Sequence, residues 1–156
     1  MASPPQKGRR VRVILFVFVL GLIALSIALG LFHKTPWIIP PPEKARKNPL
    51  SASEANLTAA RAVYGEKCAN CHGEKGKGDG SDAMMYDPAP SDLTDAAQIG
   101  KLTDGEIFYQ ITEGRKPMPS FRKKLTEEQR WQLVLLVREV AAGRAGLPPQ
   151  EQEERK

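Results

Sequence analysis

Two cysteines and a histidine form the most distinctive chemical pattern in the sequence. Cys68, Cys71 and His72 stand in the arrangement C-x-x-C-H. Two thiols at this spacing can form thioethers to the two vinyl groups of one haem, and the adjacent imidazole can then reach the iron as its proximal ligand. The pattern therefore predicts one covalently attached haem c with its iron bound by His72.

Other uses of this motif fit the sequence less well. A structural zinc site needs four ligands, usually from two such pairs, but the chain has no cysteines besides Cys68 and Cys71. A thioredoxin-like redox pair would require a βαβ setting, whereas the residues around the motif have a helical pattern. A secreted fold held by disulfides would normally have four or more cysteines.

Three helices are expected to position this motif. Each begins at a capping box: Ser51 with Glu54, Thr103 with Glu106, and Thr126 with Gln129. Apolar residues then recur at helical spacing: Leu57, Ala60 and Tyr64; Ile107, Phe108 and Ile111; Leu133, Val134, Val137, Val140 and Ala141. Gly114 and Gly143 are expected to end the second and third helices.

Residues 51–142 resemble a class I c-type cytochrome of the small bacterial monohaem kind. The resemblance rests on the order of the first helix, the haem motif, the Met-Pro-x-Phe strap at 118–121 and the final helix. It implies an all-α cytochrome c fold of about three to five helices around one haem, with Ala60 and Tyr64 contacting the last helix. The family often has an aromatic residue where this chain has Leu136, and Trp131 lies about one turn earlier.

The resemblance also implies the remaining haem contacts. Met118 lies in the strap and is the expected distal iron ligand, because a thioether is a soft ligand suited to iron. Met84 and Met85 are rivals, although they follow His72 by only about a dozen residues and lack the strap pattern. A five-coordinate iron is a further alternative.

A backbone carbonyl is expected to accept the other imidazole N–H of the proximal histidine. The family uses a proline carbonyl after the haem motif, and both Pro88 and Pro90 qualify; we favour Pro90.

An apolar run precedes the haem domain. Residues 13–32 carry no charge, and at about 1.5 Å per residue they can cross a hydrocarbon core of about 30 Å. Lys7, Arg9, Arg10 and Arg12 before the run indicate a cytoplasmic flank, so the haem domain is expected on the other side. A signal peptide cleaved near residues 28–30 is the alternative, but its apolar region usually has only about 7–15 residues.

The expected organisation is a basic cytoplasmic flank at 1–12, a transmembrane anchor at 13–32, a proline-rich linker at 33–50, the cytochrome c domain at 51–143 and a polar tail at 144–156. The prolines and cations of the linker favour an extended, polyproline-like spacer, either a mobile tether or a passive stalk. Residues 51–156 carry 15 basic and 17 acidic side chains, which argues against a nucleic-acid partner.

Two protein ligands on the iron would leave no open coordination site, which favours an electron carrier over an enzyme and predicts no small-molecule substrate. We expect single-electron transfer between redox proteins at the periplasmic face of a bacterial cytoplasmic (inner) membrane. The alternatives are a fixed haem subunit of a respiratory or photosynthetic complex, and a haem sensor or enzyme with a displaceable distal ligand. A basic group around the strap predicts an acidic docking partner: Arg115, Lys116, Arg122, Lys123 and Lys124.

Overall fold

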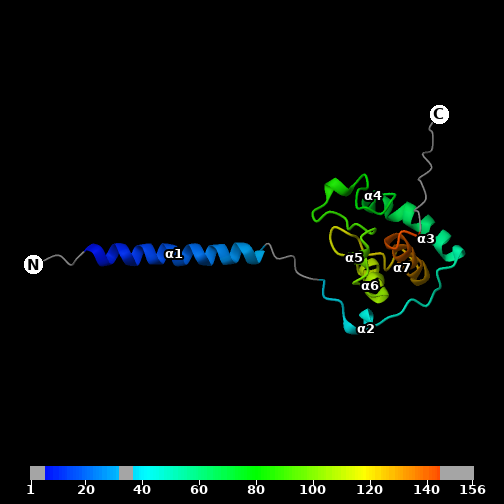
Figure 1. Cartoon of the computed structure of the whole chain (residues 1–156), viewed down its shortest axis with the longest axis horizontal. Coiled ribbons are helices and arrows are strands. Elements are labelled where there is room, and N and C mark those ends of the chain that lie inside the picture. Colours follow the sequence, from blue (N-terminus) through cyan, green and yellow to red (C-terminus); the bar gives the residue numbers. More distant parts are fainter. Residues whose placement is uncertain (1–5, 32–36, 145–156) are drawn as a thin grey trace, which may run out of the picture. The chain divides into compact units, whose positions relative to one another are not determined.

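The computed structural model describes residues 6–31 and 37–144, and it places side chains at residues 8, 11–27 and 37–144. These residues fold into α-helices, one 3-10 helix and connecting turns, without a strand; Arg115 and Met118 form an isolated bridge. The elements are α1 (Gln6–Leu31), α2 (Pro41–Lys44), α3 (Glu54–Lys67), α4 (Ala69–His72), η1 (Ala83–Met85), α5 (Ala96–Ile99), α6 (Asp104–Glu113) and α7 (Glu127–Ala141). Two compact units, residues 1–38 and 39–156, are described separately (Figure 1).

The first unit contains α1, a single helix of 26 residues. Its side chains from Val11 to Ile27 are all exposed, and most of them are large and apolar. Ser26, a polar residue among them, donates its hydroxyl to the carbonyl of Ile23 at 2.8 Å. In the part of the chain that the structure describes, no helix reaches the length and hydropathy of a membrane span.

Several predicted features of the N-terminal and C-terminal segments lie outside the described residues. Phe32 at the end of the predicted span is one of them, as is His33 at the start of the predicted linker. The side chains of Lys7, Arg9 and Arg10 in the basic flank and those at the alternative cleavage site, 28–30, are likewise outside, as is most of the polar tail, 145–156.

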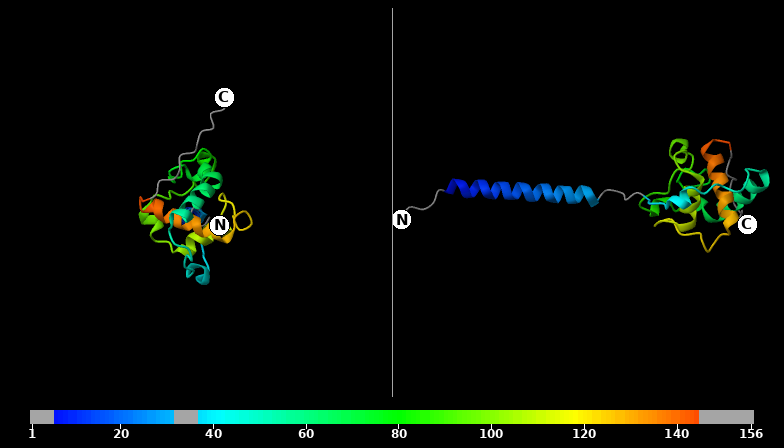
Figure 2. Two further views of the ribbon diagram at one scale, coloured as in Figure 1. Left: turned by 90° about the vertical axis from the view of Figure 1, so that its right-hand side faces the viewer. Right: turned by 90° about the horizontal axis from the view of Figure 1, so that it is seen from below.

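The second unit is built around α7. Helices α3, α5 and α6 all pack on α7, and α4 follows α3 after one residue (Figures 1 and 2). The core side chains Phe108, Val134 and Leu136 are almost completely buried, and the rings of Phe108 and Trp131 stack with centroids 3.9 Å apart. The three long helices of this unit are those that the sequence predicts, and three further helices of four residues each accompany them in the described residues.

Local capping signals explain where the long helices begin. Thr103 with Glu106 and Thr126 with Gln129 form reciprocal capping boxes, as predicted. The third expected box, Ser51 with Glu54, does not form: Ser53 is the N-cap of α3, and its hydroxyl accepts from the amide of Asn56 at 3.3 Å. Because the helix begins at Glu54, that glutamate is its first residue rather than its third, and its side chain cannot reach back to a cap at residue 51.

The helix ends also follow the sequence. Gly114 closes α6 with a φ of 64°, a left-handed conformation that glycine adopts without the strain of a Cβ. The final helix α7 ends at Ala141, and Gly143 follows with a φ of 67°.

Residues 41–50 differ from the extended spacer that their prolines predict. Pro41 and Pro42 occupy the first turn of the short helix α2, where a missing amide hydrogen costs nothing. Helix α2 packs on α6, and the hydroxyl of Thr103 donates to the carbonyl of Lys44 at 2.7 Å. The compact unit therefore begins at Ile39, twelve residues before the predicted boundary at Ser51.

Candidate haem-binding site

The C-x-x-C-H motif spans the sharp turn between α3 and α4. Cys68 is the junction residue, and its carbonyl oxygen accepts the amides of Cys71 at 3.1 Å and His72 at 2.9 Å. The motif is thus wound into one helical turn directly after α3. Buried Tyr64 braces this turn, because its hydroxyl donates to the carbonyl of Gly73 at 2.8 Å and burial raises the pKa of its phenol.

Both cysteines of the motif are free and half-buried. Burial is the larger cause and the nearby Cys71 the smaller cause that together raise the pKa of the Cys68 thiol to about 12. Burial, and to a lesser extent the charge of Asp82, also raises the pKa of the Cys71 thiol. Both side chains are therefore neutral thiols at pH 7, whereas a reactive redox cysteine has a lowered pKa. Neutral, sheltered thiols fit conversion to stable thioethers better than they fit thiol–disulfide exchange.

The imidazole of His72 has a defined orientation. Its Nδ1 lies 3.0 Å from the carbonyl oxygen of Ser91, and a carbonyl can only accept, so Nδ1 carries the proton. Nε2 is left with its lone pair, which is the form that binds a metal. Burial lowers the pKa of His72, against a smaller opposing effect of the Ser91 hydrogen bond, and thus also favours the neutral ring.

The partner of His72 is one residue away from the one that we predicted. Neither Pro88 nor Pro90 accepts this hydrogen bond; Ser91 does. The carbonyl of Pro90 instead lies against Gly78, where a Cβ would come within 2.4 Å of it. The sequence offers no signal for this choice, because any residue supplies a backbone carbonyl and the direction of each one depends on the path of the loop.

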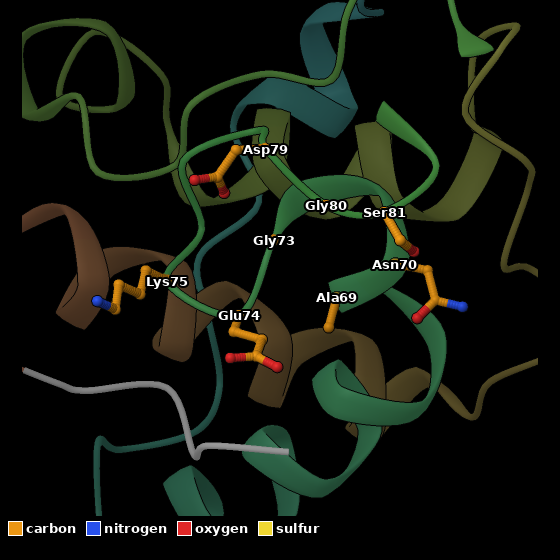
Figure 3. Close-up of a pocket in the computed structure, with 8 residues that line it drawn as sticks. All are labelled: Ala69, Asn70, Gly73, Glu74, Lys75, Asp79, Gly80 and Ser81. Atoms are coloured by element: carbon orange, nitrogen blue, oxygen red, sulfur yellow. The ribbon is translucent and has the colours of Figure 1, made fainter. Parts of the chain in front are cut away.

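A glycine-rich loop at residues 73–81 folds back over α4 (Figure 3). The amide of Gly78 donates to the carbonyl of His72 at 2.7 Å, and the amide of Gly80 donates to that of Cys71 at 3.2 Å. A Cβ on Gly80 would lie 2.2 Å from the carbonyl of Asn70, so only glycine allows this approach. The loop thereby satisfies the last carbonyls of the haem motif and fixes its backbone.

The loop and α4 also enclose a pocket of about 360 Å³. Its lining is Ala69, Asn70, Gly73, Glu74, Lys75, Asp79, Gly80 and Ser81 (Figure 3). None of the four predicted haem-binding side chains lines this pocket, so it is a feature of the loop that supports the motif rather than the space that those side chains face.

Burial separates the three methionines that follow the haem motif. Met84 is 99% exposed and Met85 is 69% exposed, whereas Met118 is half-buried and packs against the hydrophobic core. Cys68 packs against the same core, so the thiol and the thioether of Met118 border one apolar interior. Met118 therefore remains the candidate distal ligand.

The strap that carries Met118 is fixed to the end of α6. Its backbone closes a turn in which the amide of Met118 donates to the carbonyl of Arg115 at 2.8 Å. Buried Phe121 donates its amide to the carbonyl of Ile111 at 3.2 Å, and the hydroxyl of Ser120 donates to the carbonyl of Thr112 at 2.7 Å. These contacts hold the strap on both sides of the thioether.

The donor set fits haem c. It comprises two neutral thiols at thioether spacing, an imidazole with a free Nε2 and a thioether on a rigid strap. In the described residues, no group of three or more His, Cys, Asp or Glu side chains converges as a metal site.

Comparison with known proteins identifies relatives of this domain. Residues 55–137 match the family model described as cytochrome c oxidase, cbb3-type, subunit III. Cytochrome c6 of Synechococcus elongatus is 31% identical over 75 residues, which are 48% of this chain and 79% of that protein. Cytochrome c6 of Thermosynechococcus vestitus is 31% identical over 79 residues, which are 51% of this chain and 65% of that protein, slightly less than two thirds.

A solved structure is also similar. A chain of the reducing HAO-like protein complex of Kuenenia stuttgartiensis superposes with a TM-score of 0.51 and 33% sequence identity, over 59% of this chain and 46% of that chain. The family match covers more than half of the 156 residues, including the haem motif and the strap. The protein therefore belongs to the class I c-type cytochromes, in the family of cytochrome c oxidase, cbb3-type, subunit III, and this family implies a covalently bound haem c.

Proposed function

We propose that this protein is a membrane-anchored carrier that passes single electrons between redox proteins on the outer, periplasmic face of a bacterial cytoplasmic membrane. Cys68 and Cys71 would hold the haem by thioethers, and His72 and Met118 would ligate its iron. When bound, the haem supplies a one-electron ferric/ferrous couple. The chain supplies the attachment, the orientation of the imidazole and an apolar wall.

The placement of Met118 carries this proposal. A thioether held on the strap and packed against the core is available as a second protein ligand to the iron, whereas Met84 and Met85 are exposed to solvent. With two protein ligands, the iron would have no open site for a substrate or gas. Electron transfer through the haem edge is then the remaining activity.

The proposed anchor is the apolar run at 13–32. A helix that is apolar on all sides has no polar face to turn to water, and the exposed side chains of α1 between Val13 and Leu25 have this character. The hydrogen bond from Ser26 to its own helix satisfies a polar hydroxyl internally, as a lipid environment requires. The basic residues before the run support an extracytoplasmic position of the haem domain.

A basic strap surface supports a redox partner of acidic character. We define this surface by the three exposed lysines Lys116, Lys123 and Lys124, which flank Met118 and Phe121. Arg122 lies beside them and pairs with Glu113. A positive surface around the distal ligand would attract an acidic partner to the side of the haem from which Met118 approaches.

A second candidate function is that of a fixed haem subunit in a larger complex. The matching family is described by an oxidase subunit, and the similar Kuenenia stuttgartiensis structure is a protein complex. This candidate shares the haem site and the anchor with the first and differs only in whether the domain leaves its partner.

Purification of the full chain from membranes in a mild detergent tests these two functions. The carrier should sediment with the membrane fraction, resist extraction by salt or alkali, and then migrate alone after solubilisation. Stoichiometric co-purification with other subunits would contradict the carrier function and support the fixed subunit. Recovery in the soluble periplasmic fraction would contradict the proposed anchor in both.

A further inference from the structure

Two segments meet beside the imidazole of His72. One is the glycine-rich loop, which starts directly after the haem motif (Figure 3), and the other is the stretch from Pro90 to Leu93. The amide of Leu93 donates to the carbonyl of Gly76 at 2.6 Å, which fixes the end of this stretch to the loop. The carbonyl of Ser91, which orients the imidazole, therefore lies in a segment that the glycine-rich loop holds in place.

Gly78 is the residue of the loop that contacts both the histidine and its partner. Its amide donates to the carbonyl of His72 at 2.7 Å, so its backbone is tied to the candidate iron ligand. A Cβ on Gly78 would lie 2.4 Å from the carbonyl oxygen of Pro90 and 3.4 Å from the carbonyl carbon of Ser91. Gly78 thus joins the backbone of His72 to the peptide groups that carry the acceptor for its side chain.

This close approach limits where the Ser91 carbonyl can lie. A Cβ at residue 78 would force the Pro90 carbonyl to move by about 0.6 Å, from 2.4 Å to the 3.0 Å below which such contacts essentially do not occur. The hydrogen bond of His72 has little room for such a movement, because Nδ1 and the Ser91 oxygen are already 3.0 Å apart and N–H···O bonds are about 2.7–3.2 Å long. A side chain at residue 78 would therefore weaken or break this bond.

We propose that Gly78 is a positioning residue for the proximal histidine, because its missing side chain lets the backbone of Pro90 and Ser91 come close enough to accept from Nδ1. This inference rests on the proposed ligation of the iron by His72. The hydrogen bond at Nδ1 makes Nε2 a better electron donor, which favours ferric iron. Loss of the bond should therefore raise the reduction potential, whereas loss of the Met118 thioether would lower it.

A matched pair of variants separates this role from backbone strain. Gly78 and Gly143 both have a positive φ, 76° and 67°, which asparagine tolerates better than most residues with a side chain. A Cβ on Gly143 would have nothing within 4 Å. Gly78→Asn therefore adds a steric contact with the segment that carries Ser91, whereas Gly143→Asn adds the same side chain without such a contact.

The exchange of the Nδ1 proton with solvent measures the hydrogen bond directly. The full-length holoprotein is prepared in detergent with ¹⁵N-labelled histidine and with His33→Gln, so that His72 is the one histidine left in the sequence. In the ferrous state, the NMR signals of an iron-bound imidazole are recognised by the large upfield shift that the haem ring current causes. We expect exchange to be about fivefold faster in Gly78→Asn, the effect of losing a typical hydrogen bond, together with a raised potential. Gly143→Asn should keep both wild-type values.

The outcomes distinguish this inference from the proposed ligation. If the ring current does not shift the imidazole of His72 in the wild type, His72 does not bind the iron, and the ligation and the positioning role both fail. If the imidazole is shifted but Gly78→Asn leaves the exchange unchanged or lowers the potential, the positioning role alone is wrong.

A second variant tests the role even if Gly78→Asn does not incorporate haem. Pro90→Ala relaxes the same segment without adding an atom near Gly78, so the Nδ1 proton should exchange at the wild-type rate. Faster exchange in Pro90→Ala would show that the proline ring, rather than the contact with Gly78, positions the carbonyl of Ser91.

Discussion

The imidazole of His72 is oriented by a backbone atom rather than by a charged side chain. The carbonyl of Ser91 fixes the proton on Nδ1 and leaves Nε2 for the iron. A neutral carbonyl makes the imidazole less electron-donating than a carboxylate partner would, which favours the ferrous state. The thioether of Met118 acts in the same direction, because a soft, neutral ligand stabilises ferrous iron.

Met118→Ala should therefore keep the covalent haem and lower its reduction potential. The variant retains both cysteines but replaces the thioether by water or an empty position. Axial ligands tune haem potentials over roughly 0.8 V, and we expect a decrease on the order of 0.1 V or more. Potentiometric titration measures this change, and the ferric spectrum should lose the weak long-wavelength band that the family shows when methionine binds the iron.

The control for this prediction is Met84→Ala. Met84 is almost fully exposed, so its removal should change neither the potential nor the spectrum. A decrease of the potential in the Met84 variant, together with an unchanged Met118 variant, would reassign the distal ligand. Carbon monoxide binding to the ferrous wild-type protein at neutral pH would instead support a displaceable ligand and a sensor or enzyme.

At the level of elements, the sequence predicts what is encoded locally. Two of the three capping boxes and the three long helices were predicted because a cap and its helix are neighbours in the chain. The Ser51 box was wrong by two positions, because two serines compete for one cap and the path of the preceding loop decides between them. The choice of Ser91 over Pro90 depends on loop geometry in the same way.

Helix α2 could not be predicted from its own residues. Three consecutive prolines indicate an extended chain, whereas α2 packs on α6 and the residues just after α2 contact α7, both far away in the sequence. Arg46 is the main link, because its guanidinium covers the stacked Phe108 and Trp131 rings and reaches Glu127. The boundary of the haem domain thus depends on a tertiary contact that no local pattern shows.

Arg46→Ala should weaken the attachment of the α2 segment to the domain. A cation–π contact contributes about 0.5–2 kcal/mol and a partly exposed ion pair about 0.2–1 kcal/mol, so we expect a loss of about 1–2 kcal/mol in the free energy of unfolding. Denaturant unfolding of the detergent-solubilised holoprotein measures it. Lys47→Ala removes an exposed cation next to Arg46 and should be neutral; equal midpoints for both variants would contradict the role of Arg46.

Across the whole molecule, charge is arranged by segment. The exposed lysines of the basic strap surface lie between residues 116 and 124, whereas acidic side chains gather after the haem motif: Asp79, Asp82, Asp87, Asp92 and Asp95. Residues 51–156 are nearly neutral in sum, so steering of a charged partner would depend on local groups of charge rather than on net charge. A local charged group orients a charged partner as it approaches, and salt weakens this effect.

Replacement of Lys116, Lys123 and Lys124 by glutamine should slow electron transfer to an anionic oxidant. Hexacyanoferrate(III) serves as a small anionic oxidant in place of the acidic protein partner. At low ionic strength, where the Debye length is about 30 Å, we expect the bimolecular rate constant to fall by about tenfold, the lower end of the range for electrostatic steering. At about 0.15 M salt the difference should largely disappear, because screening then acts within about 8 Å. Stopped-flow mixing measures both rates.

The matched control replaces Lys75, Lys77 and Lys101, three exposed lysines outside the strap, and produces the same change in net charge. If steering depends on position, this control should retain most of the wild-type rate, and a cationic oxidant should react faster with the strap variant than with the wild type. If both triple variants slow equally, only net charge matters and the basic strap surface is not the docking site. Because Met118 lies within that surface, a positional effect would also show that electrons leave on the side of the distal ligand.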